Sequence, residues 1–165
     1  MNKIIAITLL SAALVTPAFA ADFATSTPAT PFYAGVQVGD GTTILGGYQI
    51  DKMFAVEADY TTYGGHSSFN NCGSYCDYSS LGVFGTAIFP LSLKGNIPLS
   101  VFGKVGIVRT TATSRYTGYN TATDTSIGLG GGVQYDFNKR ISGRLGLDIN
   151  TYYANNLYIG AIFKF

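Results

Sequence analysis

The stretch "NLYIGAIFKF" (156–165) alternates apolar side chains with other residues along its whole length. Successive side chains of an extended strand point to opposite faces, so one face of this segment is entirely apolar. Its members are Leu157, Ile159, Ala161, Phe163 and Phe165. Such a strand needs an apolar environment on that face and hydrogen-bonding partners along both backbone edges. The rest of the sequence indicates what that environment is.

The composition fits strands that have one face in lipid. The chain has 21 Gly, 12 Tyr, 11 Phe and no Trp, and only 12% of its residues are charged, whereas about 25% is typical of soluble domains. Helix signals are nearly absent. Outside the first twenty residues, whose one charged residue is Lys3, the chain has nine basic and nine acidic residues. This lack of a basic surplus argues against a nucleic-acid binder.

The first twenty residues are typical of an export signal. They contain Lys3, an apolar stretch over 4–15 and the small-residue pattern Ala18-Phe19-Ala20, which predicts cleavage near Ala20. The apolar stretch is too short to span a bilayer as a helix, although an uncleaved anchor is the alternative. We expect residues 1–20 to be a signal peptide, residues 21–31 a mobile periplasmic leader and residues 32–165 a single β-domain.

That domain contains eight alternating segments. They lie at about 32–39, 43–50, 53–63, 80–89, 99–110, 125–137, 141–150 and 156–165. A soluble sandwich would alternate too, but here the face opposite the aliphatic one is rich in Gly and poor in charge, and aromatic residues gather at the strand ends. An even number of strands of about ten residues suits a tilted barrel, in which closure satisfies every backbone group. The sequence therefore predicts an all-β, eight-stranded, antiparallel up-and-down transmembrane β-barrel.

The connections between these segments alternate in length. Segments 50–53, 92–98 and 138–140 are short and are expected to be periplasmic turns, because such barrels have short periplasmic turns and longer surface loops. The polar segments 64–77 and 111–123 are predicted to be surface loops. The other two surface connections, near 40–41 and 154–155, are short.

Among the charged residues that the alternation places on the inward face, four are candidate site residues: Glu57, Lys104, Arg144 and Asp148. The interior of an eight-stranded barrel is only wide enough for side chains. We therefore expect paired charges to plug a polar lumen. A narrow, low-conductance channel through the same residues is the alternative reading.

Four motifs resemble the transmembrane domain of OmpA-like outer-membrane proteins: "FYAGVQVG" (32–39), "GGYQI" (46–50), "GGGVQYDF" (130–137) and the aromatic last strand. The resemblance covers about 32–165 and implies localisation to the outer membrane. It also implies that the last strand pairs with the first, and that Phe163 and Phe165 form the signal read by the barrel-assembly machinery.

The resemblance further implies an interior charge cluster that has been proposed to act as a gate. Glu57 stands at the glutamate of that cluster and Lys104 at its basic partner. Thr86 and Gln134 stand where the family usually has a lysine and a glutamate. The cluster is therefore expected to be reduced to one family pair, together with Arg144 and Asp148.

Other candidate residues lie outside the interior. Cys72 and Cys76 are expected to form a disulfide, because export delivers them to an oxidising compartment; two thiols without a histidine pair are weak evidence for a metal site. His66 is the one histidine, and no acid can be assigned to orient it for Ser-His-acid catalysis, so we predict no enzyme and no cofactor. Arg109 is expected at the outer interface, about 25 Å above Leu99. There, contact with a lipopolysaccharide phosphate is one hypothesis and ordinary snorkelling of the side chain is the alternative.

The function predicted from the sequence is that of a small, non-enzymatic outer-membrane barrel with a structural or surface role. The expected partners are membrane lipid, lipopolysaccharide and the assembly machinery, and the barrel is expected to be monomeric. Besides the narrow channel, an adhesin acting through the segments 64–77 and 111–123 is an alternative of a different class.

Overall fold

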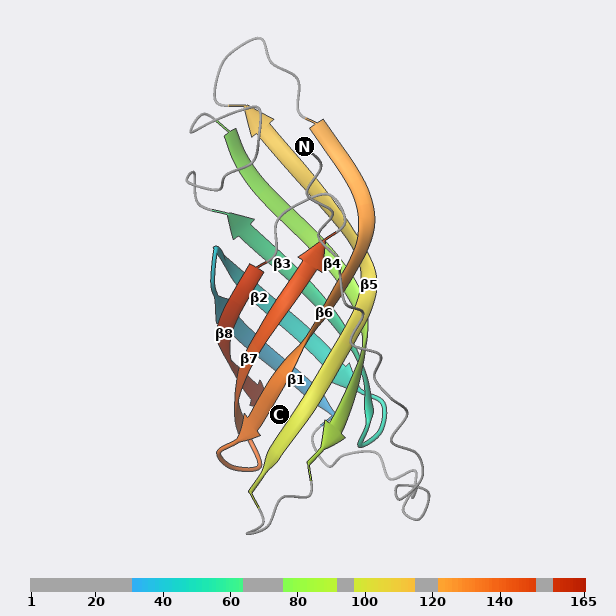
Figure 1. Ribbon diagram of the computed structural model, residues 1–165, viewed down its shortest axis with the longest axis vertical. Helices are drawn as coiled ribbons and strands as arrows, with labels where there is room; N and C mark the ends of the chain where they lie inside the picture. The colour runs from blue at the N-terminus through green and yellow to red at the C-terminus, as the bar shows by residue number, and fades with distance from the viewer. Residues whose placement is uncertain (1–30, 64–75, 92–96, 115–121, 151–155) are drawn as a thin grey trace, which may run out of the picture.

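The computed structural model describes residues 31–63, 76–91, 97–114, 122–150 and 156–165, and within them the chain forms a closed antiparallel barrel (Figure 1). Its eight strands are β1 (Phe32–Val38), β2 (Gly41–Gln49), β3 (Phe54–Tyr63), β4 (Cys76–Pro90), β5 (Leu99–Ser114), β6 (Ala122–Asp136), β7 (Ile141–Asn150) and β8 (Asn156–Lys164). Each strand pairs with its neighbours in chain order, which confirms the predicted fold class. In the part of the chain described, no helix has the length and apolarity to cross a membrane.

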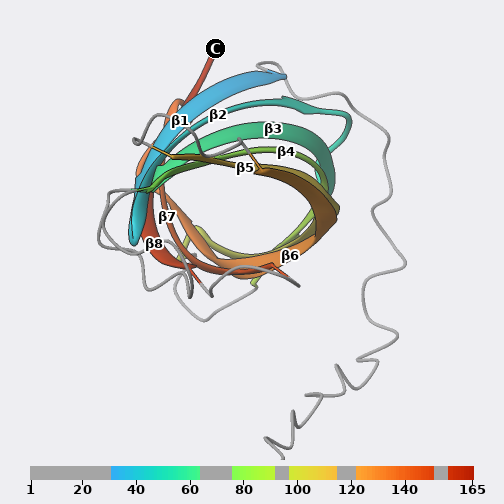
Figure 2. The same ribbon diagram turned by 90° about the horizontal axis from the view of Figure 1, so that it is seen from above.

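The barrel closes where β8 meets β1, and Figure 2 shows the two strands side by side in the ring. Their register runs from Tyr33 opposite Lys164 to Val38 opposite Ile159. The backbone N–H of Phe165 adds a hydrogen bond to the Phe32 carbonyl at 2.9 Å. The stretch 156–165 therefore keeps its alternation to its last residue because it is a sealing strand with partners on both edges.

The aliphatic faces of the strands point outward. Ile107 and Ile127, for example, are 63% and 61% exposed. In a soluble sandwich these faces would meet as a core, so the sandwich alternative is wrong. Near the end that carries the short turns, aromatic side chains are exposed around the barrel: Phe32, Tyr48, Phe54, Phe89, Tyr135, Phe137, Phe163 and Phe165.

Three strands are longer than the sequence predicted. The strands β4, β5 and β6 have 15, 16 and 15 residues, whereas β1 and β2 have 7 and 9. The loop bounds predicted at 64–77 and 111–123 were therefore wrong, because β4 begins at Cys76, β5 runs to Ser114 and β6 begins at Ala122. These extensions are rich in Thr, Ser and Tyr, which suit a β-ladder but break the apolar alternation used for the prediction.

The three long strands form a wall that rises beyond the rest of the barrel (Figure 1). At about 3.3 Å per residue and a tilt near 40°, a 16-residue strand spans roughly 40 Å along the barrel axis, against about 25 Å for the apolar band of such barrels. We call this extension, residues 76–79, 109–114 and 122–125, the upper wall. It carries the ends of the connecting segments 64–75 and 115–121.

The predicted signal peptide (1–20) lies outside the described residues, as does nearly all of the predicted leader (21–31). So do His66, Cys72 and the side chain of Cys76, and with them the predicted disulfide.

Candidate functional site

The centre of the barrel holds an ion pair between strands that are not neighbours. Arg144 on β7 donates through Nη1 to both carboxylate oxygens of Glu57 on β3, at 2.9 and 3.0 Å. Both residues are almost completely buried, at 2% and 1% exposed. The Tyr33 hydroxyl, on β1, donates to the same carboxylate at 2.8 Å. A charge at this depth is tolerated only when it is paired and hydrogen-bonded, and here both conditions are met.

The Arg144 guanidinium is fixed on its other sides as well. Its Nε and Nη2 atoms donate to the Gln134 side-chain oxygen at 3.3 and 3.0 Å. Its central carbon lies 4.3 Å from the centroid of the Phe102 ring, a cation–π arrangement. Contacts from three directions leave this side chain little freedom to move.

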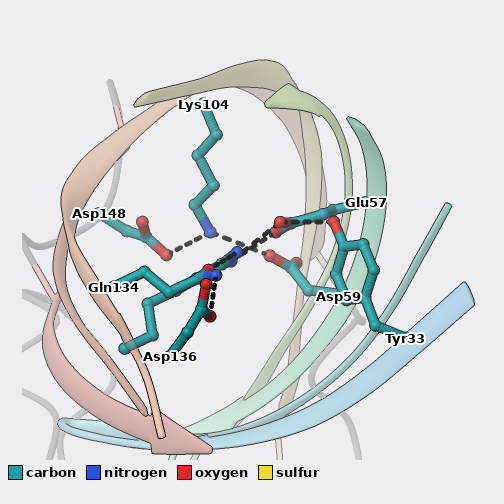
Figure 3. Close-up of polar contacts among 8 residues, drawn as sticks. Tyr33, Glu57, Asp59, Lys104, Gln134, Asp136 and Asp148 are labelled. Atoms are coloured by element: carbon teal, nitrogen blue, oxygen red, sulfur yellow. Dashed lines mark hydrogen bonds and ion pairs between the residues drawn. The ribbon is translucent and has the colours of Figure 1, made fainter. Parts of the chain in front are cut away.

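A second cluster is centred on Lys104 of β5, whose side chain points into the barrel toward Asp148 and Asp59 (Figure 3). The Lys104 ammonium forms ion pairs with Asp148 at 2.9 Å and Asp59 at 3.4 Å. It also lies 4.5 Å from the Phe84 ring centroid and 5.5 Å from that of Tyr158. One ammonium therefore neutralises two carboxylates, and it also makes cation–π contacts with the two aromatic rings.

A third cluster, centred on Asp136, lies toward the turn end. One oxygen of Asp136 accepts hydrogen bonds from the Gln134 amide at 3.1 Å, from the Lys164 ammonium at 2.9 Å and from the Ser142 hydroxyl. Gln134 bonds to both Asp136 and Arg144, so it links this cluster to the central ion pair.

Apolar groups complete the interior, so the expectation of a purely polar lumen was incomplete. Two buried clusters fill it: Tyr33, Leu45, Ala55 and Ile162, and Ile88, Phe102 and Tyr158. Inward glycines make room for these large groups. A Cβ added at Gly146 would lie 2.6 Å from Cζ of Tyr158, closer than real Cβ contacts, and 3.0 Å from Cζ of Phe102, which is tighter than most.

The interior contains cavities at its two ends. One, of about 170 Å³, lies at the turn end; the other, of about 30 Å³, lies toward the loop end. The two share no lining residue. Between them stand the central ion pair and the surrounding aromatic rings.

The structure brings all four sequence-predicted interior residues inside, but with different partners from those the resemblance implied. The ion-pair partner of Glu57 is Arg144, and Lys104 pairs with Asp59 and Asp148. The site also uses Asp59, Asp136, Lys164 and Tyr33, which the sequence analysis did not single out. The signal that could have found them is the same alternation, since each occupies an inward position.

The predicted surface residues are also placed. Arg109 is exposed on the outer face of β5. At its row, the outward side chains change from aliphatic to hydroxyl-bearing. Below its row, Val83, Ile107 and Ile127 lie side by side; above it, Ser79, Thr111 and Thr123 do so. Phe163 and Phe165 are 54% and 67% exposed. Among the described side chains, no group of three or more His, Cys, Asp and Glu residues is suited to hold a metal ion.

Comparison with known proteins gives a family and several structural neighbours. The family described as "Outer membrane protein beta-barrel domain" matches residues 6–165. The N-terminal β-barrel domain of Pseudomonas aeruginosa OprF superposes with a TM-score of 0.61 at 15% identity, covering 81% of this chain and 95% of that one. Neisserial surface protein A gives 0.55 at 20% identity, with 81% and 93% covered.

A third neighbour is the Yersinia pestis outer membrane protein Ail in a phospholipid bilayer nanodisc, with a TM-score of 0.53 at 14% identity and coverage of 82% and 99%. Comparison with curated proteins finds no match. At these identities the neighbours show a shared fold.

Proposed function

The chain belongs to the outer membrane protein β-barrel domain family, and from this premise we propose that it is a non-enzymatic barrel of the outer membrane whose interior is sealed by its own side chains. Outer-membrane localisation follows from the family. The structural role, the sealed interior and the absence of catalysis are the proposal. The observation that carries it is the central Glu57–Arg144 pair, which is held between cavities that share no lining residue.

Three physical features support a sealed interior rather than an open pore. The charges that would line a pore are paired with one another at 2.9–3.4 Å. The Phe102 and Tyr158 rings fill space beside them. An eight-stranded barrel has no room for a wide water column once such side chains are in place.

Release of entrapped solutes tests this proposal. Liposomes that contain the refolded barrel are loaded with a small sugar and with potassium ions. We expect both to be retained as in protein-free liposomes. Release of the sugar at a rate proportional to the amount of protein would contradict the sealed interior.

The upper wall favours a second candidate function, which is surface recognition. Three strands extend well beyond the apolar band and connect to the segments 64–75 and 115–121. Outward side chains there are mainly hydroxyl-bearing, including Thr113, Thr123 and Thr125. Loss of cell or matrix binding on deletion of 64–75, with the gel mobility of the folded barrel unchanged, would establish this role.

Arg109 is proposed to contact a phosphate group of lipopolysaccharide. It is exposed and marks the row where the outer face changes from aliphatic to hydroxyl side chains, which is the height expected of lipid phosphates. Arg109→Ala should reduce the lipopolysaccharide retained during purification, whereas Arg140→Ala, in a turn at the opposite end, should not. If the wild type, Arg109→Ala and Arg140→Ala retain equal amounts of lipopolysaccharide, Arg109 does not bind a phosphate, and ordinary snorkelling explains its position.

Phe163 and Phe165 are proposed to act as the assembly signal. Phe163 lies on β8 and Phe165 directly follows that strand, and both rings are exposed. Phe165→Ala should slow insertion by the assembly machinery but leave spontaneous folding into detergent unchanged. The same slowing in detergent would instead assign the ring to barrel stability.

A further inference from the structure

We propose that the cavity at the turn end is a binding pocket for a small oxyanion, a function beyond the sealing role. The cavity has a volume of about 170 Å³, several times the roughly 30 Å³ occupied by a water molecule in the liquid. It is therefore large enough for a group the size of phosphate or acetate. Short turns mark this end as the periplasmic one, so the ligand would enter from the periplasm.

The charge of the lining points to an anion. Three basic side chains line the cavity, Lys52, Arg144 and Lys164, together with one acidic side chain, Asp136. Asp136 is already engaged, since one of its oxygens accepts three hydrogen bonds. Lys164 is paired with Asp136 and Arg144 with the buried Glu57, so the charge of Lys52 is the uncompensated one in this lining, and it is positive.

A count of hydrogen-bond donors points the same way. A guanidinium has five N–H groups, and Arg144 uses four contacts, two to Glu57 and two to Gln134. An ammonium has three; Lys164 makes one contact, to Asp136, and within the described residues Lys52 has no recorded partner. The lining therefore has unused charged donors: one N–H of Arg144, two of Lys164 and three of Lys52.

The parts of the pocket also differ in rigidity in a way that suits binding. Arg144 and Gln134 are buried and held in place, so one wall is preorganised. Lys52 is exposed on the turn between β2 and β3 and can close over a ligand from the mouth. Charge-assisted hydrogen bonds from such groups to an oxyanion are shorter and stronger than neutral ones.

Calorimetric titration of the refolded chain in detergent micelles at low ionic strength tests the pocket. Inorganic phosphate is the first probe and acetate the second. We expect saturable one-to-one binding of phosphate, weakened roughly tenfold in Lys52→Gln through loss of one charge-assisted contact. Lys52→Gln/Lys164→Gln should bind more weakly still. Tighter binding of acetate with the same dependence on Lys52 would support the pocket and assign it to carboxylates.

Lys139→Gln is the matched control. Lys139 is an exposed basic residue in the turn between β6 and β7, at the same end of the barrel but outside the cavity lining. Failure of both anions to saturate the wild-type protein would overturn the proposal, as would equal weakening by Lys139→Gln and Lys52→Gln. If the double variant fails to fold, as judged from gel mobility with and without heating, the single variant decides, since Lys52 packs in no core cluster.

Discussion

Arg144 and Glu57 are 87 positions apart in the sequence, yet one nitrogen of the guanidinium contacts both oxygens of the carboxylate at 2.9 and 3.0 Å. The pair joins β7 to β3 through the inside of the barrel, whereas the backbone ladder joins only neighbouring strands. It is therefore a cross-brace between two strands that are not joined by the backbone ladder.

Glu57→Ala should lower the free energy of unfolding by about 3–5 kcal/mol, because it leaves the Arg144 charge buried without its partner. Replacing both residues by apolar side chains of similar size, Glu57→Leu/Arg144→Met, should cost less than Glu57→Ala alone. Because the chain has no Trp, circular dichroism in a urea titration is the suitable measurement. The single variants Glu57→Leu and Arg144→Met complete the cycle. If the free-energy losses of these two single variants add up to that of the double variant, the two residues do not interact directly.

Lys104→Ala should destabilise the barrel by a similar amount, about 3–5 kcal/mol. The substitution leaves Asp59 and Asp148 facing each other without the cation that both contact. Lys139→Ala serves as the control, since Lys139 lies on an exposed turn. The same urea titration applies, and equal midpoints for the two variants would show that the interior lysine contributes nothing.

Gly146→Ala should cost about 1–3 kcal/mol, because the added methyl group would overpack the interior against Tyr158 and Phe102. Gly46→Ala provides a matched control on the outer face, where an added Cβ meets nothing within 4 Å. The midpoint temperature of unfolding, monitored through gel mobility, distinguishes the two variants. A Gly146→Ala protein as stable as Gly46→Ala would mean that the inward face has more free space than the structure shows.

Val105→Arg should destabilise the barrel in lipid vesicles by about 2–4 kcal/mol, the cost of a cation near the bilayer midplane. Val105 is exposed on the outer face, near the middle of the apolar band. Thr113→Arg, on the same strand within the upper wall, should cost about 1 kcal/mol or less. Similar costs at both positions would mean that lipid does not cover the face at Val105.

The two faces of each strand were predictable from the sequence because a strand has a side-chain period of two. Lipid on one face and a crowded interior on the other enforce that period: in β2, for example, Ile44 is exposed and Thr43 is buried. The ends of the long strands were less predictable. Residues such as Thr111 and Thr123 continue the β-ladder beyond the apolar band. Because these extensions have no apolar face, the alternation of apolar residues cannot reveal them in the sequence.

The partners inside the barrel could not be derived from local sequence. Alternation places Glu57, Lys104 and Arg144 inside, but the stagger of the strands around the ring decides which charges lie at the same height. The resemblance suggested Glu57 with Lys104, and the structure pairs Glu57 with Arg144. The contribution of Asp136 and Lys164 depends on the same stagger, because β6 and β8 bring them together from either side of β7.

The central claim is that the interior side chains seal the barrel, and ionic current through a planar bilayer measures this most directly. With the folded wild-type protein inserted, as shown afterwards by recovery of the heat-sensitive gel band, we predict a current indistinguishable from that of the bare bilayer. Glu57→Ala, which unpairs the cross-brace, should add current noise. Discrete, reproducible conductance steps from the wild-type barrel would contradict the sealed interior.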